Sequence, residues 1–399
     1  MLASNSKQNK ALNLRLVLSY IATLSPISRA EIARISGLTK QTITNMVDEL
    51  LAAALVTEVG VKKDGVVGKP SKMLALCASG TYSVGIRVFE HYCVLALFNL
   101  TNQKLAQSRI ARSDDLPQAL NQAVITLLSQ HQLSIASLLG IGLSFADQAD
   151  QHYPNHQARL DFVQQLANTS GQPVTLETTA SACAACHMLY GEAKGLNSFV
   201  YVHLGRQIES TVVFGRRIML GHNQLSGHLG EIFVSAETSS KDGELGRLND
   251  FASLSALQQL SRQSELDLDS LTSLMQQQPQ LIDKWLEHAA EPMRIAIHML
   301  ESVFNSQTII FGGDVTTELL DLFIARLRPL IPSIAQFGSR DVPRMIKTPN
   351  VYDIAISGIA TLPLHSALDM DRPYSACLPQ FSALTSKQAL LYLNDSQSG

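Results

Sequence analysis

Residues 28–56 read SRAEIARISGLTKQTITNMVDELLAAALV, and this stretch predicts two short amphipathic helices joined by a tight turn. Ser28 and Glu31 have the spacing of a capping box, which places the start of the first helix at Arg29. Gly37 can adopt the left-handed conformation that ends a helix. The segment therefore has the pattern of a helix-turn-helix.

The second of these helices is predicted to have one buried face and one face rich in hydrogen-bond donors. Thr39 can cap its N-terminus. The buried stripe has the spacing i, i+3, i+4 and i+7 and consists of Ile43, Met46, Val47 and Leu50. The opposite face consists of Lys40, Gln41, Thr44 and Asn45. Such a face, without negative charge, suits the major groove of DNA. The alternative is a helical hairpin with an ordinary solvated face.

The residues after the two helices predict a basic wing. Strands are expected at 55–59 and 73–76, joined by the loop GVKKDGVVGKPSK at 60–72. Its lysines can bind the DNA backbone, and a Gly-Lys-Pro segment can enter a narrow minor groove. The candidate DNA-binding residues are Ser28, Arg29, Thr39, Lys40, Gln41, Thr42, Thr44, Asn45, Lys62, Lys63, Gly68, Lys69, Pro70 and Lys72.

Positive charge is concentrated at the N-terminal end of the chain. Residues 1–76 hold ten Lys and Arg against five Asp and Glu, a net charge of +5. The remaining residues carry a net charge of −8, so the whole chain has a net charge of −3. A near-neutral protein with one basic end is expected when only that end binds phosphate groups.

Length and composition predict a cytoplasmic protein of two or three domains. The chain has 399 residues, of which 46% are hydrophobic and 16% charged. No run approaches the ~18 apolar residues of a membrane span, and the first ten residues lack the apolar core of a signal peptide. A small, odd number of cysteines favours reduced thiols. They are Cys77, Cys93, Cys183, Cys186 and Cys377.

Alternating strand and helix patterns follow the wing. A first α/β segment has expected strands at 82–88, 93–100, 108–111, 138–145 and 174–177, and helices at 116–130, 160–169 and 180–190. A second has expected strands at 199–204, 211–214, 217–220 and 308–311, and helices at 254–262, 283–304, 317–327 and 355–362. Two α/β lobes predict a ligand cleft between them.

The order of short motifs in this body resembles the ROK family (repressor, open reading frame, kinase), and specifically its repressor branch. The matching landmarks are Gly85-Ile86, Pro154-Asn155, Glu177-Thr178-Thr179, Gly230-Glu231-Ile232, Phe311-Gly312-Gly313 and Gly358-Ile359-Ala360. The resemblance implies a winged helix-turn-helix followed by a two-lobed α/β body of the actin and hexokinase (ribonuclease H-like) type.

We expect three domains on this basis. Residues 1–76 are predicted to form the winged helix-turn-helix, residues 77–195 the first lobe and residues 196–379 the second lobe. A C-terminal helix at 380–394 is expected to pack back on the first lobe.

The departures from the family pattern fall on the residues that transfer phosphate in its kinases. The catalytic Asp of the family falls on Thr179, which cannot act as a base near neutral pH. The Asp of the first phosphate loop falls on Arg87, and Phe89 and Glu90 replace glycines. The second loop reads LGRQIEST at 204–211, where side chains fill the space that a nucleotide needs. We therefore expect no enzyme activity and no cofactor.

The zinc ligands of the family are also replaced, so we expect no metal. Ser240, Asp242 and Arg247 stand at the three cysteine positions, and Val234 at the histidine position. This set lacks the thiolates and imidazole that hold structural zinc. An ion pair between Asp242 and Arg247 is expected to replace the zinc clasp in part.

A C-x-x-C-H sequence, the spacing of c-type haem attachment, occurs at 183–187. It lies within an alanine-rich predicted helix, where close packing of small side chains is the simpler explanation. We therefore expect a buried helix here.

Three residues remain where the family binds sugar: Asn155, Glu177 and Glu231. The resemblance implies that a sugar or sugar phosphate could still bind between the lobes. The alternative is that these side chains only bond to their own loops.

The resemblance implies a DNA-binding transcriptional regulator, most often a repressor of carbohydrate uptake or catabolism genes, which senses a sugar. A homodimer or homotetramer is expected, because one winged helix contacts few phosphates, and two would require an inverted-repeat operator. Two alternatives stay open: a sugar kinase with an accessory DNA-binding domain, and a regulator controlled by a protein partner.

Overall fold

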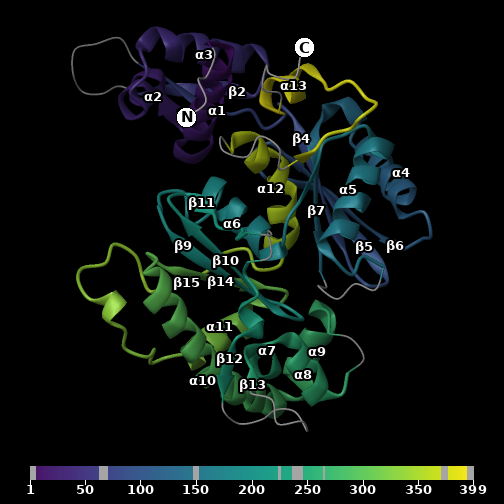
Figure 1. The fold of residues 1–399 in the computed structure, drawn as a ribbon, viewed down its shortest axis with the longest axis vertical. Helices are drawn as coiled ribbons and strands as arrows, with labels where there is room; N and C mark the ends of the chain where they lie inside the picture. The colour runs from purple at the N-terminus through teal and green to yellow at the C-terminus, as the bar shows by residue number, and fades with distance from the viewer. Residues whose placement is uncertain are drawn as a thin grey trace. The chain divides into compact units, whose positions relative to one another are not determined.

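The computed structural model describes residues 6–62, 71–146, 152–222, 226–235, 246–263, 266–369 and 376–392 (Figure 1). Contacts group the chain into two compact units. Unit 1 comprises Met1–Thr178, Ala185–Tyr190 and Ile356–Gly399, and unit 2 comprises Thr179–Ala184 and Gly191–Ala355. Among the described helices, none has the length and apolar character that crossing a membrane requires.

The N-terminal part of unit 1 is a winged helix. Its elements are α1 (Ser6–Leu24), β1 (Ile27–Ser28), α2 (Arg29–Ser36), α3 (Lys40–Ala52), β2 (Val56–Lys62) and β3 (Ser71–Leu76). The strands form an antiparallel sheet in the order β1-β3-β2.

The predicted helix boundaries are confirmed. Ser28 and Glu31 form the capping box of α2, and Gly37 ends that helix with a φ of 69°. Thr39 caps α3 by accepting a hydrogen bond from the backbone N–H of Thr42. The predicted apolar stripe of α3 is buried.

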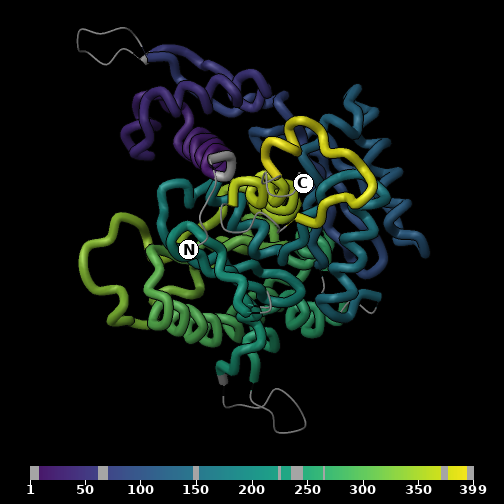
Figure 2. Tube along the Cα trace, turned by 45° about the horizontal axis from the view of Figure 1, so that its top comes forward, coloured from purple at the N-terminus to yellow at the C-terminus, as the bar shows by residue number. Residues whose placement is uncertain are grey.

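Helix α1, which was not predicted from the sequence, supplies one side of the winged-helix core. Its buried positions also have the i, i+3, i+4 and i+7 spacing: Leu14, Val17, Leu18 and Ile21. They belong to a hydrophobic cluster that extends to side chains of the body, namely Leu189, Leu364, Leu368, Leu391 and Tyr392. Figure 2 shows the purple helix α1 beside the yellow C-terminal segment, and α1 contacts α13 (Ser386–Tyr392). Within unit 1, the winged helix and the body therefore share one core.

The body of unit 1 is a mixed sheet in the order β16-β8-β7-β4-β5-β6. Its strands are β4 (Tyr82–Val88), β5 (Tyr92–Asn99), β6 (Lys104–Ala111), β7 (Leu138–Phe145), β8 (Val174–Leu176) and β16 (Ala376–Cys377). Helices α4 (Leu116–Ser129) and α5 (His156–Ser170) pack on one face, and a 3-10 turn, Ile135–Ser137, precedes β7 (Figure 1).

Helix α12 (Ile354–Leu368) approaches the same sheet closely through two glycines. A Cβ atom on Gly142 would lie 1.7 Å from the carbonyl oxygen of Ile359, and one on Gly85 would lie 2.8 Å from that of Ile356. Gly85 is a landmark of the predicted first phosphate loop. In this protein its lack of a side chain is required by helix packing.

Unit 2 contains a second mixed sheet in the order β11-β10-β9-β14-β15 and a two-stranded pair, β12-β13. The strands are β9 (Phe199–Leu204), β10 (Ile208–Phe214), β11 (Arg217–Ile218), β12 (Phe233–Ser235), β13 (Gly246–Arg247), β14 (Ile309–Gly313) and β15 (Met345–Lys347). The helices are α7 (Leu248–Ala252), α8 (Leu254–Ser261), α9 (Leu268–Gln277), α10 (Pro279–Phe304) and α11 (Thr317–Arg326), with 3-10 turns at Leu229–Glu231 and Ile334–Gln336. Helix α6 (Thr179–Leu189) begins in unit 2 and ends in unit 1.

The predicted domain limits stay a prediction. The two compact units have other limits. The predicted second lobe extends to residue 379, whereas α12 from Ile356 onward belongs to unit 1 because of its packing on β4 and β7. The predicted C-terminal helix at 380–394 begins later, at Ser386. Thr385 caps it by accepting from the Gln388 N–H at 3.3 Å.

Candidate nucleic-acid interface

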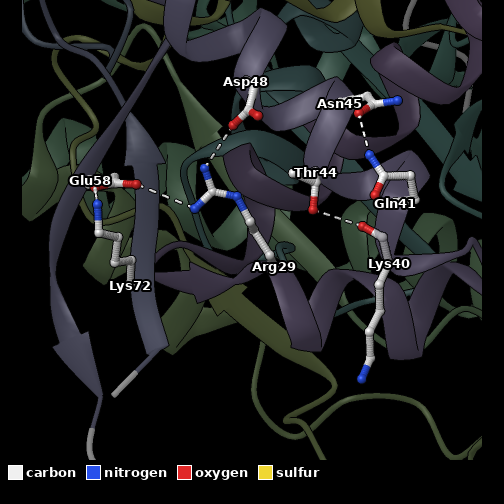
Figure 3. A network of polar contacts seen from close by, with 8 residues as sticks. All are labelled: Arg29, Lys40, Gln41, Thr44, Asn45, Asp48, Glu58 and Lys72. Atoms are coloured by element: carbon white, nitrogen blue, oxygen red, sulfur yellow. Dashed lines mark hydrogen bonds and ion pairs between the residues drawn. The ribbon is translucent and has the colours of Figure 1, made fainter. Parts of the chain in front are cut away.

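The outward face of α3 carries the predicted donors in a defined arrangement (Figure 3). Lys40, Gln41 and Asn45 are exposed, and Thr44 is half-buried. The Nε2 of Gln41 donates to the Oδ1 of Asn45 at 2.9 Å. The hydroxyl of Thr44 donates to the backbone carbonyl of Lys40, also at 2.9 Å. The helix thus presents one cation and one pre-formed amide pair to its surroundings.

The two threonines of the first turn are used for capping. The hydroxyl of Thr39 accepts from the N–H of Thr42 at 3.1 Å, and the two hydroxyls lie 2.9 Å apart. Thr39 is exposed and Thr42 is half-buried. Both residues therefore fix the start of α3 and can still accept or donate a bond at its surface.

Arg29 links α2 to α3 and to the wing, and it shares the carboxylate of Glu58 with Lys72 (Figure 3). The Arg29 guanidinium lies 3.1 Å from Asp48 on α3 and 3.3 Å from Glu58 on β2. Glu58 also lies 2.6 Å from the Nζ of Lys72 on β3. The bond from Lys72 lowers the pKa of Glu58, and Arg29 adds to that effect. The charges of Arg29 and Lys72, two of the predicted DNA-binding residues, are therefore partly neutralised by this network.

The network was not found from the sequence, because its acidic members are far from Arg29 along the chain. Asp48 and Glu58 lie 19 and 29 residues away. Ser28 also differs from the expectation. It is 4% exposed, and its hydroxyl and N–H both bond to Glu31. Ser28 therefore acts as the cap of α2, with little side-chain surface exposed.

Part of the predicted wing falls outside the described residues. This applies to Lys63, Gly68, Lys69 and Pro70, and to the side chain of Lys62.

The position of the family's catalytic Asp is buried. Thr179, at the start of α6, is 1% exposed. The buried carboxylate of Glu209 accepts from the N–H of Ala180 at 3.2 Å. Beside it, the hydroxyls of Ser181 and Thr211 lie 3.0 Å apart. A carboxylate at a helix N-terminus is stabilised by the free N–H groups and by the helix dipole. Glu209 therefore serves as a cap where the kinases of the family have a glycine-rich loop.

The other phosphate-binding landmarks also have structural explanations. Arg87 is buried on β4, with its guanidinium carbon 5.0 Å from the centre of the Phe89 ring. A Cβ atom on Gly313 would lie 2.1 Å from the carbonyl oxygen of Leu204, and one on Gly312 would lie 2.2 Å from the hydroxyl of Tyr201. The diglycine thus allows β14 to pack within its own sheet.

The predicted sugar residues are divided between the two units, with Asn155 and Glu177 in unit 1 and Glu231 in unit 2. Asn155 caps α5 by accepting from the Ala158 N–H at 2.9 Å. Glu231 lies 2.5 Å from Arg247, and it accepts from Asn249 at 3.1 Å. Asn155 and Glu231 therefore have bonds within their own units.

At the former zinc motif, Arg247 pairs with Glu231. The predicted partner, Asp242, lies outside the described residues, as does Ser240. Val234 is buried. Among the described residues, no group of His, Cys, Asp and Glu has the arrangement of a metal site.

The C-x-x-C-H segment lies in a buried part of α6, as predicted. Cys183, Cys186 and His187 are all at most 5% exposed. The thiol of Cys186 lies 3.3 Å from the hydroxyl of Ser357, and burial raises its pKa. Burial also lowers the pKa of His187 to about 4. These side chains therefore belong to the packed interior around α6.

Unit 2 also contains a cavity of about 340 Å³ whose chemistry does not suit a sugar. Apolar side chains provide most of its wall, including Met219, Met299, Val303 and Phe304. Sugar sites need several convergent polar groups. We therefore do not place a sugar in this cavity.

Comparison with known proteins agrees with this architecture. A model of the ROK family matches residues 83–362, and a model of the MarR family matches residues 15–65. The xylose repressor of Bacillus subtilis (strain 168) is 27% identical over 235 residues, which cover 56% of this chain and 61% of that protein. The alignment thus spans less than two thirds of that repressor. The DNA-binding transcriptional repressor Mlc of Escherichia coli (strain K12) is 22% identical over 347 residues, covering 77% of this chain and 82% of that protein.

Two solved structures show the same fold. A ROK family transcriptional regulator, a homologue of the E. coli Mlc protein, has a TM-score of 0.68 at 19% identity and covers 90% of this chain and 98% of its own. The ROK hexokinase of Thermus thermophilus has a TM-score of 0.53 at 19% identity, with coverages of 71% and 97%. Since the family model alone spans more than half of the sequence, the chain belongs to the ROK family.

Proposed function

We propose that this protein is a DNA-binding transcriptional regulator of the repressor branch of its family. The observation that carries this proposal is the outward face of α3, where Lys40, Gln41 and Asn45 stand exposed on a winged helix. A helix with cationic and amide side chains on its solvent face is suited to the major groove. The repressor names of the xylose and Mlc proteins support the same conclusion.

The regulated genes are proposed to serve carbohydrate uptake or catabolism, and the body is proposed to sense a sugar or sugar derivative. Support comes from the names of the relatives, among them a xylose repressor. Two winged helices of a homodimer or homotetramer would bind an inverted repeat in the cytoplasm. Effector binding would change the population of DNA-binding states by its differential affinity for them.

We further propose that the body does not transfer phosphate. Thr179 has no carboxylate to accept the proton of a sugar hydroxyl, and Glu209 places a negative charge at the N-terminus of α6, where phosphate would be repelled. The fold itself does not decide this point, because the T. thermophilus hexokinase shares it.

Three measurements test these proposals separately. Gel-shift and fluorescence-anisotropy titrations with duplexes from the promoter regions around the gene should show saturable binding at physiological salt. Calorimetry with a panel of monosaccharides and their phosphates should detect an effector, and saturable binding would exclude control by a protein partner alone. A coupled ATP assay with the same sugars should show no turnover. Failure of every duplex to bind would refute the regulatory proposal.

A further inference from the structure

We infer that Asn45 contacts an adenine in the major groove, that Gln41 positions the Asn45 amide for this contact, and that Thr44 presents its methyl group to a thymine. This inference rests on the proposed DNA binding and specifies which bases the helix α3 selects. It is carried by the two side-chain hydrogen bonds of the outward face, from Gln41 to Asn45 and from Thr44 to Lys40 (Figure 3).

The bond between the two amides fixes the orientation of Asn45. Positions i and i+4 are neighbours on a helix surface, and here the Gln41 Nε2 donates to the Asn45 Oδ1 at 2.9 Å. A primary amide has two N–H donors and an oxygen with two lone pairs. Asn45 therefore keeps both N–H groups and one lone pair for DNA, and the bond from Gln41 determines where they point.

This arrangement is complementary to adenine and only half complementary to guanine. Adenine presents the N7 acceptor and the N6 donor side by side, so one amide can donate to N7 and accept from N6. Guanine presents two acceptors, N7 and O6, and leaves the Asn45 oxygen unpaired. A bidentate contact of this kind discriminates against the wrong base by roughly 5- to 150-fold.

Thr44 is set up to make an apolar contact. Its hydroxyl hydrogen is used in the bond to the Lys40 carbonyl at 2.9 Å. The half-buried side chain can therefore offer a ligand its methyl group and its oxygen lone pairs. Threonine methyl groups contact the C5 methyl of thymine in the major groove.

The acidic residues of the next turn limit the base-contacting surface to the first two turns of α3. The carboxylate of Asp48 lies 3.1 Å from Arg29, and that of Glu49 lies 2.9 Å from Lys10. Carboxylates cannot face phosphates favourably, so this end of the helix belongs outside the groove. The exposed Lys40 at the other end is suited to a phosphate or a guanine.

The test is selection of duplexes from a random library by the full-length protein at fixed salt, followed by titration of the selected duplex carrying modified bases. Replacing the critical adenine by 7-deazaadenine removes N7 and should weaken wild-type binding about tenfold. Asn45→Ala should lose that sensitivity, and Gln41→Met should reduce it at the same base pair. Lys284→Ala, on the exposed surface of α10, is the control and should behave as wild type.

A matched pair of variants tests Thr44. Replacing the critical thymine by deoxyuridine removes the C5 methyl and should weaken binding by wild type and by Thr44→Val, which keeps a methyl group. Thr44→Ser keeps the hydroxyl and loses the methyl, so it should be insensitive to deoxyuridine.

The possible outcomes distinguish a failure of the base assignment from a failure of the proposed DNA binding. A selected motif in which no base pair is sensitive to 7-deazaadenine would overturn the assignment of Asn45 while leaving DNA binding established. Equal sensitivity in wild type and Asn45→Ala would do the same, and the wild-type titration needs no variant to fold. Enrichment of no duplex by the wild-type protein would overturn the proposed function and this inference together.

Discussion

Two polar regions of this protein, the face of α3 and the start of α6, differ in whether their polar side chains are exposed or buried. On α3, Gln41 and Asn45 bond to each other and remain exposed. At the start of α6, Glu209 and Thr179 are at most 6% exposed, and Glu209 bonds to the backbone of α6. On α3, a ligand could reach the polar groups. At the start of α6 the polar groups are buried, and Glu209 caps the helix. This contrast supports the proposal that the winged helix recognises DNA.

The largest effect is expected for Thr179→Asp, which places a carboxylate where the kinases of the family have their catalytic Asp. A second buried carboxylate near Glu209 would be repelled by it, and an uncompensated buried charge costs roughly 3–5 kcal/mol of unfolding free energy. Urea denaturation at pH 7 should show this loss, and the loss should shrink near pH 4 as the new group is protonated. Thr179→Asn is the matched neutral control.

Phosphotransfer should stay absent in Thr179→Asp, since Glu209 still occupies the N-terminus of α6. If the variant were as stable as Thr179→Asn, or turned over ATP with a hexose, the start of α6 would be an open site.

The next effect concerns His187, which lies in the buried part of α6. Burial lowers its pKa from 6.5 to about 4, so the folded protein keeps the imidazole neutral. Between these values the unfolded chain binds a proton that the folded chain does not bind, and stability therefore falls as the pH drops from 6.5 to 4. The linkage is about 3 kcal/mol.

His187→Gln should flatten this part of the pH profile of the unfolding free energy. The exposed His131→Gln, in the same unit, should leave the profile as it is. Equal slopes in wild type and His187→Gln would mean that His187 is hydrated, and that α6 is more open than the structure shows.

The sequence was sufficient to predict the ends of α2 and the start of α3 in the winged helix, because the signals for these helix ends are local. The capping box at Ser28, the left-handed Gly37 and the cap at Thr39 each determine a helix end within four residues. Helix α1 had a usable signal in Leu14, Val17, Leu18 and Ile21, but we predicted no helix there.

What the sequence could not predict depended on long-range contacts. Glu58 is 29 residues from Arg29, and Glu209 is 29 residues from Ala180, so neither bond has a local pattern. The amide pair of α3 is the exception, because its i, i+4 spacing is readable in the sequence. Its direction, with Gln41 donating, required the structure.

Substitutions on the exposed face of α3 should lower the affinity for DNA and leave the stability of the protein unchanged. Lys40→Ala combined with Asn45→Ala should weaken binding to the selected operator by roughly 100-fold, since a base contact and a phosphate contact are lost in each winged helix. Anisotropy titration measures this loss, and the slope of log affinity against log salt should fall by about one for each lysine removed. The unfolding midpoint should not change. Unaltered affinity would assign the DNA contacts to the wing.

The smallest expected effect comes from the carboxylate that joins the two strands of the wing to α2. Glu58→Gln removes the ion pair of Lys72 and one of the two ion pairs of Arg29, and exposed ion pairs contribute little. The folded pKa of Glu58 is lowered, so its contribution is present above its ordinary pKa of 4.5 and is lost as the pH falls through the lower folded value.

At pH 7 the variant frees Lys72 from its ion pair, while Arg29 keeps its ion pair with Asp48. Lower repulsion of phosphate should then offset the looser positioning of the wing. We expect a change in operator affinity of about two- to fourfold, reduced further at high salt. Glu287→Gln, an exposed partner of Arg326 on the other unit, is the matched control. A loss of tenfold or more in Glu58→Gln would show that the wing needs this carboxylate to reach DNA, and that the exposed region is as dependent on internal bonds as the buried one.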